Sequence, residues 1–385
     1  MTHIPPPLKK STSLRHLDAL RGLLAIYVAI GHARWMLWCG WNNWRQTNHA
    51  TIPDLAAMAS GIFRFGHEAV LIFFALSGFF IHLRASYSLA KPLHYHLDIR
   101  AFYIRRAHRI LPVYYASIAF TFLLDTTGVA WLPRLYEGNT GDTLLDGLFN
   151  MQRYSAGTYL RALLLIPASN GIPLGSNGPL WSIGYEIIYY AAYPIWLAVR
   201  KLSWKAAYIS TPALIACITT FIPLPTYIDS VASHYVIWIG GAATAELLAR
   251  NRLRLPYQLC AALTLLTTVA YAQSSPRVST MLLATLVSAL TISTFLAAPP
   301  SLPKHRVWKI LEWIGFRSYS IYVFHMPVLV LMSAAFFYFA GERPHSAWPC
   351  VAGCLTAITI GILSFKLVES KFLHRPETTP PVQNQ

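Results

Sequence analysis

The sequence predicts an all-α integral membrane protein, a bundle of about ten transmembrane helices. Of its 385 residues only 12% are charged and 55% are apolar, and the mean hydropathy is +0.43. Soluble globular chains carry about 25% charged residues. Apolar windows of about 20 residues, the length a helix needs to cross a bilayer, recur along the chain. Composition and periodicity together exclude a disordered chain and argue against a water-soluble enzyme.

The expected spans follow one another in chain order and alternate in direction. They are Leu17–Trp38, Ile62–Leu83, Ile110–Leu124, Pro179–Val199, Ala206–Ile222, Ser230–Leu248, Pro256–Ala272, Val278–Ala297, Ser318–Phe339 and Ala347–Leu367. With the N-terminus in the cytoplasm, the inner segments hold 22 Lys and Arg residues and the outer segments hold 6. This asymmetry predicts that both ends of the chain are cytoplasmic.

The spans divide the chain into one membrane domain and two short ends. We expect a cytoplasmic N-terminal segment at 1–16, a transmembrane domain at 17–370 and a cytoplasmic tail at 371–385. Two connections are long, an inner loop at 84–109 and an outer loop at 125–178. A loop of that length usually has a function, and we expect the outer one to contain a helix around Thr143–Ile166.

The net charge of +16 invites a nucleic-acid hypothesis, but its distribution argues against one. The basic residues form small clusters between apolar segments, as topology signals do, and no nucleic-acid-binding motif is present. The five cysteines lie in or beside apolar stretches without a Cys-x-x-Cys or zinc spacing. Packing is therefore their expected role, and neither a metal site nor a disulfide framework is predicted.

Ionisable residues within spans are costly and are therefore functional candidates. The first span carries Asp18, Arg21 and His32. Arg21 and His32 are eleven residues apart, which places them on one helix face about 16–17 Å apart along the axis. Asp18 precedes Arg21 by three residues and can pair with it.

Glu186, in the fourth span, lies at a depth similar to that of His32. A histidine beside a carboxylate is a typical general base, with the carboxylate orienting the ring. His32 could instead be a hydrogen-bonded packing residue, and His67 and Glu68 are alternative partners at a similar level.

Arginines gather near the expected inner mouth. Arg106 and Arg109 are three residues apart and share a face if the segment is helical, and Arg21 lies at the same mouth. Three converging arginines would suit a phosphorylated cytosolic ligand, although ordinary positive-inside anchoring is the alternative. His325, in the inner half of the ninth span, could contact such a ligand or could simply pack.

Five short motifs resemble, in order, those of the membrane acyltransferase 3 family, and the likeness covers residues 14 to about 370. They are Leu17-Asp18-Ala-Leu-Arg21-Gly22…His32, Phe73-Phe74-Ala-Leu-Ser77-Gly78-Phe79, Arg106-Ala-His-Arg109, Trp181-Ser182-Ile-Gly-Tyr-Glu186 and Ser318-Tyr319-Ser320-Ile-Tyr322-Val-Phe-His325-Met-Pro327. The sequence departs from the family's pattern at Gly184, Tyr185 and the approach Gly66–Ala69, which can reflect the acceptor.

The resemblance implies an O-acyltransferase, an enzyme that transfers groups other than amino-acyl groups. The donor would be cytosolic acetyl-CoA or another acyl-CoA, with no metal, and the acceptor a sugar hydroxyl of an exopolysaccharide or another cell-envelope glycan. Expected partners are the bilayer and, beyond the substrates, polysaccharide biosynthesis proteins. The expected location is a bacterial cytoplasmic membrane. Some relatives carry an esterase-like domain after the bundle, and we expect a stand-alone form here.

The hypothesis assigns roles to residues of the motifs. We expect Arg21, Arg106 and Arg109 to hold the coenzyme A phosphates, His32 to act as general base, and Glu186 to orient it. Transfer could be direct, or could pass through an acyl-enzyme on His32 or Ser182. The residues expected to line the track between the two ends are Asp18, Ser77, Trp181, Ser182, Tyr322 and His325.

Two other classes compete with the enzyme. A transporter or flippase for a glycan intermediate would fit the spans and the long outer loop, but it does not need a phosphate clamp at one mouth and a base beyond it. A non-catalytic scaffold or sensor would tolerate the loss of His32.

Overall fold

The computed structural model describes residues 12–40, 52–90, 96–169, 172–253, 255–274 and 277–373. Most of the expected N-terminal segment and of the C-terminal tail lies outside these residues. Each of the ten expected spans lies on helical structure. The long helices are α1 (Thr12–Leu37), α4 (Gly66–Leu89), α5 (Ile99–Trp131), α9 (Trp181–Leu202), α10 (Thr211–Phe221), α11 (Thr226–Ala249), α12 (Tyr257–Gln273), α13 (Arg277–Leu296), α15 (Ser318–Phe339) and α16 (Trp348–Ser364).

Shorter elements connect the long helices. They are α3 (Ile52–Ala59), η1 (Ser60–Arg64), α6 (Pro133–Tyr136), α7 (Thr143–Leu148), η2 (Met151–Tyr154), α8 (Ala156–Leu163), η3 (Gly178–Leu180), the π-helical turns η4 (Ala206–Ser210) and η6 (Phe365–Glu369), η5 (Leu302–Lys304), α14 (Arg306–Gly315) and α17 (Ser370–Phe372). Two short strands, β1 (Ala168–Ser169) and β2 (Ile172–Pro173), pair antiparallel in the outer loop. Apart from this pair, the described residues form an all-α protein.

The surface is that of a membrane protein. Four helical stretches of the described chain are long and apolar enough to cross a membrane, namely Ala56–Leu89, Ile99–Trp131, Ser318–Phe339 and Trp348–Phe372. Large apolar side chains also face outward on other long helices, for example Ile195 on α9, Phe221 on α10 and Leu265 on α12. Because exposing so much apolar surface to water is energetically unfavourable, these faces are suited to contact lipid. The number of crossings and the N-in orientation stay predictions.

The helices around the two long connections differ from the expectation. α4 continues to Leu89 and α5 already begins at Ile99, so most of the expected inner loop is helical. Asp98 begins α5 because its side chain accepts a hydrogen bond from the amide of Ala101, at 2.9 Å. In the outer loop, α7, η2 and α8 replace the single expected helix. Asn150 and Ser155 cap η2 and α8, and these new helix starts break the segment.

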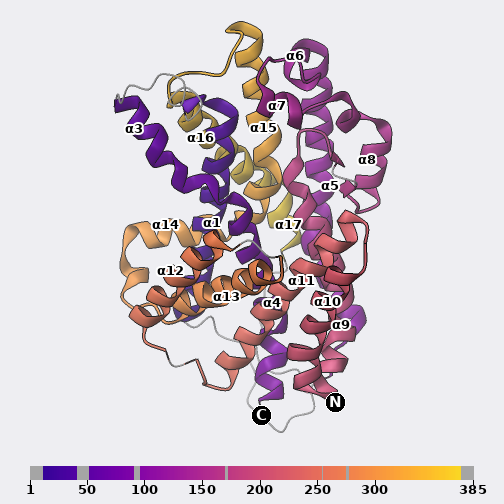
Figure 1. Ribbon diagram of the computed structural model, residues 1–385, viewed down its shortest axis with the longest axis vertical. Coiled ribbons are helices and arrows are strands. Elements are labelled where there is room, and N and C mark those ends of the chain that lie inside the picture. Colours follow the sequence, from indigo (N-terminus) through magenta and orange to yellow (C-terminus); the bar gives the residue numbers. More distant parts are fainter. Residues whose placement is uncertain are drawn as a thin grey trace, which may run out of the picture.

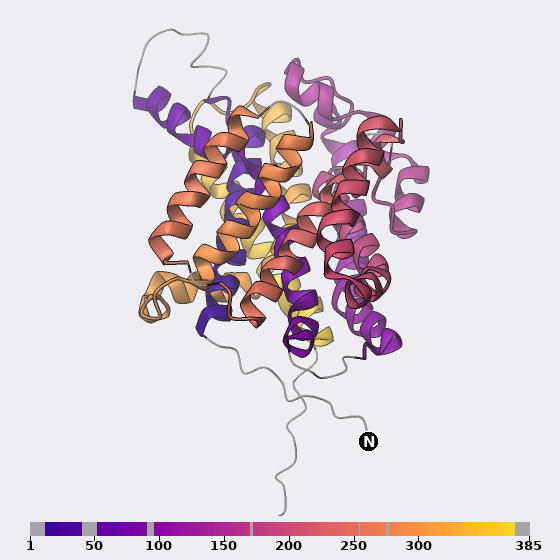
Figure 2. The same cartoon turned by 60° about the horizontal axis from the view of Figure 1, so that its bottom comes forward.

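Close backbone approaches at glycines set the packing of the bundle. A Cβ added at Gly22 on α1 would lie 2.0 Å from the carbonyl oxygen of Leu311 on α14, so these helices meet without intervening side chains. Gly78 on α4 and Gly241 on α11 likewise allow the backbones of α4 and α11 to approach each other closely. Figure 1 labels α15 and α5 in the upper half of the molecule, α1 near mid-height, and α4, α9 and α11 close together below. Figure 2 shows the long helices running side by side through the molecule.

Candidate functional site

A polar cavity of about 430 Å³ lies where six elements of the bundle meet. It is lined by side chains from α1, α4, α5, α9, α15 and η6, and most of these belong to the motifs singled out in the sequence. The polar lining residues are Asp18, Arg21, Ser77, Arg106, Arg109, Ser182, Glu186, Tyr190, Ser318, Tyr319, Tyr322 and Glu369. The structure therefore gathers residues as far apart in the sequence as Asp18 and Glu369 around one space.

Three guanidinium groups face this cavity. Arg21 on α1 lies 3.9 Å from the carboxylate of Asp18, and Arg106 and Arg109 come from successive turns of α5. The Arg106 guanidinium lies 5.9 Å from the ring centroid of Tyr190. Its buried Nε has no hydrogen-bond partner among the described residues. Arginine forks bind phosphate oxygens in pairs, so this lining suits a phosphorylated ligand.

Three carboxylates share the cavity with the arginines, from Asp18, Glu186 and Glu369. One Glu186 oxygen accepts a hydrogen bond from the Tyr190 hydroxyl. Glu369 accepts from the Ser320 amide at 3.2 Å and from its hydroxyl at 2.5 Å. The sequence analysis missed Glu369. A signal was present, because a single acid in an apolar, otherwise basic run near the end of a span is a candidate in itself.

His32 lies beyond the cavity, paired with His325. Nδ1 of His32 is 2.7 Å from Nε2 of His325, and the two rings are stacked with centroids 5.0 Å apart. Nδ1 of His325 is 2.6 Å from the carbonyl oxygen of Tyr322. A carbonyl can only accept, so in a neutral His325 Nδ1 carries the hydrogen and Nε2 carries a lone pair. His32 must then donate from Nδ1, which leaves its own Nε2 as a lone pair able to accept a proton.

The structure gives Nδ1 of His32 a partner other than the expected carboxylate. Glu186 bonds to Tyr190 and lines the cavity, whereas His32 is not among the cavity's lining residues. Tyr322 connects the cavity with the histidine pair, since it lines the cavity and its ring centroid is 5.8 Å from that of His325. We expected Glu186 to orient His32, but the side chain that contacts Nδ1 of His32 in the structure is His325.

Ser182 lines the cavity, and its hydrogen-bond partners among the described residues include no base. Its Oγ is 2.8 Å from the Tyr322 hydroxyl and 3.1 Å from the carbonyl oxygen of Pro179. Neither group takes a proton readily, so these contacts do not activate the serine as a nucleophile. Ser77 donates to the Tyr190 hydroxyl at 3.3 Å and accepts from the Trp238 indole at 3.4 Å.

Trp181, His67 and Glu68 make their contacts with residues other than the histidine pair. The Trp181 ring stacks on that of His67 with centroids 5.5 Å apart. Glu68 accepts a hydrogen bond from the Tyr271 hydroxyl at 3.3 Å and lines a second, mostly apolar cavity of about 230 Å³ between α1, α4, α12 and α13. Neither His67 nor Glu68 contacts His32.

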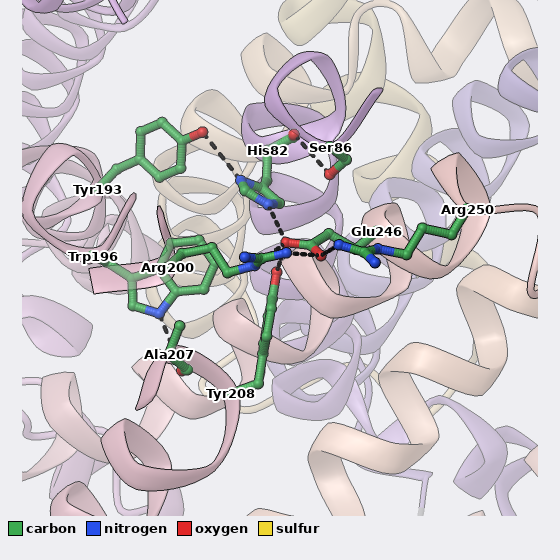
Figure 3. Close-up of polar contacts among 9 residues, drawn as sticks. All are labelled: His82, Ser86, Tyr193, Trp196, Arg200, Ala207, Tyr208, Glu246 and Arg250. Carbon is green, nitrogen blue, oxygen red and sulfur yellow. Dashed lines mark hydrogen bonds and ion pairs between the residues drawn. The ribbon is translucent and has the colours of Figure 1, made fainter. Parts of the chain in front are cut away.

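A second buried ionic cluster joins α4, α9, α11 and η4, and the sequence analysis missed it (Figure 3). Glu246 accepts two hydrogen bonds from Arg200, at 2.5 and 2.6 Å, and further ones from Tyr208 at 2.8 Å and His82 at 3.0 Å. Arg250 approaches the same carboxylate at 3.5 Å from a more exposed position. Because one carboxylate binds groups from three other elements, the cluster holds these helices together; its groups are not among those that line the polar cavity.

The fold and the site define a membrane-embedded helical protein with an arginine-lined cavity and a histidine pair beyond it. Residues 14–365 match the acyltransferase domain of the acyltransferase 3 family, and the chain belongs to that family. The resemblance inferred from the five motifs is thereby confirmed.

Curated relatives are similar over parts of their length. The chain is 27% identical over 298 residues to YrhL of Bacillus subtilis, covering 69% of this chain and 44% of the relative. It is 24% identical over 335 residues to OatA of Listeria monocytogenes, covering 79% and 51%. Both names include peptidoglycan O-acetyltransferase. Acyltransferase MdmB of Streptomyces mycarofaciens is 29% identical over 161 residues, covering 40% and 35%. The chain thus spans about half the length, or less, of these relatives. No solved structure matches it.

Proposed function

We propose that this chain is an O-acyltransferase that moves an acetyl group from acetyl-CoA to a sugar hydroxyl of a cell-envelope glycan, in a bacterial cytoplasmic membrane. The family and the names of two relatives support the reaction class. The observation that carries the proposal is the alignment of two sites on α1. Arg21 lines the cavity and His32, about 16–17 Å further along the helix, presents a lone pair at Nε2.

The donor would bind through its phosphates. Arg21, Arg106 and Arg109 hold the phosphate oxygens at the inner end of the cavity, with charge-assisted hydrogen bonds. The three carboxylates there offset part of the positive charge of the arginines. The pantetheine arm runs along the cavity toward Tyr322, whose side chain must move aside for the thioester to reach His32.

The transfer would be direct. Nε2 of His32 takes the proton of the acceptor hydroxyl while the hydroxyl oxygen attacks the thioester carbonyl carbon. The tetrahedral adduct then expels the coenzyme A thiolate, and His32 returns its proton to the sulfur. His325 positions the base, because its Nε2 holds Nδ1–H of His32 and so keeps the reactive lone pair on the opposite nitrogen.

Transfer of label from radioactive acetyl-CoA to glycan tests the proposal. Membranes containing wild-type protein are supplied with peptidoglycan fragments or an unrelated exopolysaccharide. We expect His32→Ala to lower transfer by about 10²-fold or more, the usual contribution of a general base. His305→Ala, at an exposed position before α14, is the matched control and should leave transfer unchanged.

Equal transfer by His32→Ala and wild-type protein at equal abundance would refute the role of His32. Absence of transfer by the wild type to every glycan tested, with intact binding of acetyl-CoA, would refute the acceptor class. Absence of both transfer and acetyl-CoA binding would favour the transporter hypothesis.

A further inference from the structure

We propose that five rings at the outer ends of α4 and α9 and on α11 form the binding platform for a neutral saccharide, the acceptor. This inference rests on the proposed function and names the substrate subsite. The platform consists of His67, Phe74, Trp181, Tyr185 and His234. Phe74 and Tyr185 are buried and support it by packing against Trp181 and His234. Trp181 lies at its centre, with ring centroids 5.5 Å from His67, 4.9 Å from Tyr185 and 5.9 Å from both Phe74 and His234.

The platform continues the donor cavity outward. His67 is the second residue of α4 and Trp181 the first of α9, and both helices are predicted to begin at the outer side. Phe74 belongs to the platform and also lines the cavity. Ser182, which follows Trp181 in the sequence, lines the cavity as well. A sugar on the platform would therefore approach from the side opposite the arginines.

The platform holds polar groups without partners. Nδ1 of His234 lies 2.6 Å from the carbonyl oxygen of Ser230 and carries the hydrogen of a neutral ring, which leaves a lone pair on Nε2. Within the described part of the chain, this Nε2 and both nitrogens of His67 have no hydrogen-bond partner. The buried hydroxyl of Tyr227 also lacks one, and its ring is 5.4 Å from Tyr185. The buried hydroxyl of Tyr227 is costly unless a ligand or water satisfies it, and the exposed ring of His67 is open to a ligand.

These features match the chemistry of a sugar. A pyranose ring presents C–H groups that pack on an aromatic face, and hydroxyls that both donate and accept hydrogen bonds. Trp181 supplies the face, while His67, His234 and Tyr227 supply the hydrogen-bonding groups. None of the five rings bears a fixed charge, which favours a neutral saccharide over a charged one. A metal fits less well, because no group of three or more His, Cys, Asp or Glu side chains among the described residues could hold one.

Binding and kinetics of variants in the full-length protein test the platform. We expect Trp181→Ala to raise the acceptor KM at least tenfold, to change kcat less than threefold, and to leave acetyl-CoA affinity unchanged. Trp181→Phe should restore most of the acceptor affinity, because it keeps an aromatic face. His234→Gln should raise the acceptor KM less than His234→Ala does, since its amide can replace part of the lost hydrogen bonding. Trp131→Ala, at an exposed position near the outer end of α5, is the matched control and should behave as wild type.

Calorimetric titration of the purified protein with neutral glycan fragments gives a readout independent of transfer. If wild-type protein binds the fragments and Trp181→Ala does not, the platform is supported even where no acyl transfer is detected, so the two proposals fail separately. An unchanged acceptor KM in Trp181→Ala would overturn the platform. So would equal losses of acetyl-CoA affinity and acceptor affinity, which would show that Trp181 acts only through packing.

Discussion

Two arginines that share one carboxylate should differ widely in their effect on stability. Arg200 makes two short hydrogen bonds to Glu246, and the side chains are 8% and 9% exposed. Arg250 lies 3.5 Å from the same carboxylate with 41% of its side chain exposed. Removing one partner of a buried ion pair costs about 3–5 kcal/mol, because the other charge is left uncompensated. A solvent-exposed pair contributes about 0–1 kcal/mol.

We expect Arg200→Ala to lower the free energy of unfolding by about 3 kcal/mol, the lower end of that range, because Tyr208 and His82 still donate to Glu246. Arg250→Ala should lower it by less than about 1 kcal/mol. The double variant Arg200→Ala, Glu246→Ala should lose less than the sum of its single variants, since the two residues form one unit.

Equilibrium unfolding in detergent micelles, followed by tryptophan fluorescence, measures these differences. The transitions must be reversible for the free energies to be compared. Equal losses for Arg200→Ala and Arg250→Ala would refute the reasoning that burial decides the effect. Additive losses in the double variant would show that the pair does not interact as the structure describes.

Two further predictions concern packing and a thiol. Gly22→Leu should destabilise the protein by about 3 kcal/mol or abolish folding, because its Cβ would lie 2.0 Å from the Leu311 carbonyl oxygen. Gly147→Ala is the control, since a Cβ there has no atom within 4 Å. Equal yields and equal unfolding curves for the two variants would contradict the close packing at Gly22. Burial raises the pKa of the Cys39 thiol, so less of it is thiolate at neutral pH than for an ordinary thiol. In a variant that keeps only this cysteine, the rate of alkylation should therefore still increase as the pH rises above about 9. Unfolding in detergent should shift that pH profile to lower pH, and an unshifted profile would contradict the partial burial of Cys39.

The sequence predicted most of the helices because each depends on local information. Apolar length located the ten segments, and helical spacing placed Arg21 with His32 on α1 and Arg106 with Arg109 on α5. The boundaries were less predictable, since single capping residues such as Asp98 decide where a helix begins. The convergence of Arg21, Arg106 and Arg109 was anticipated because positive-inside topology brings them to one side of the membrane.

Only the tertiary structure decided which side chains meet. Residues at equal depth on different helices touch only if the helices are neighbours and are rotated toward each other, and a single helix's periodicity does not encode that rotation. His32 therefore pairs with His325 rather than with Glu186. Glu369 likewise joins the cavity from the far end of the chain, and Glu246 finds Arg200 across two helices. Depth and helix face follow from local sequence, whereas partners follow from helix packing, which depends on contacts distributed over the whole bundle.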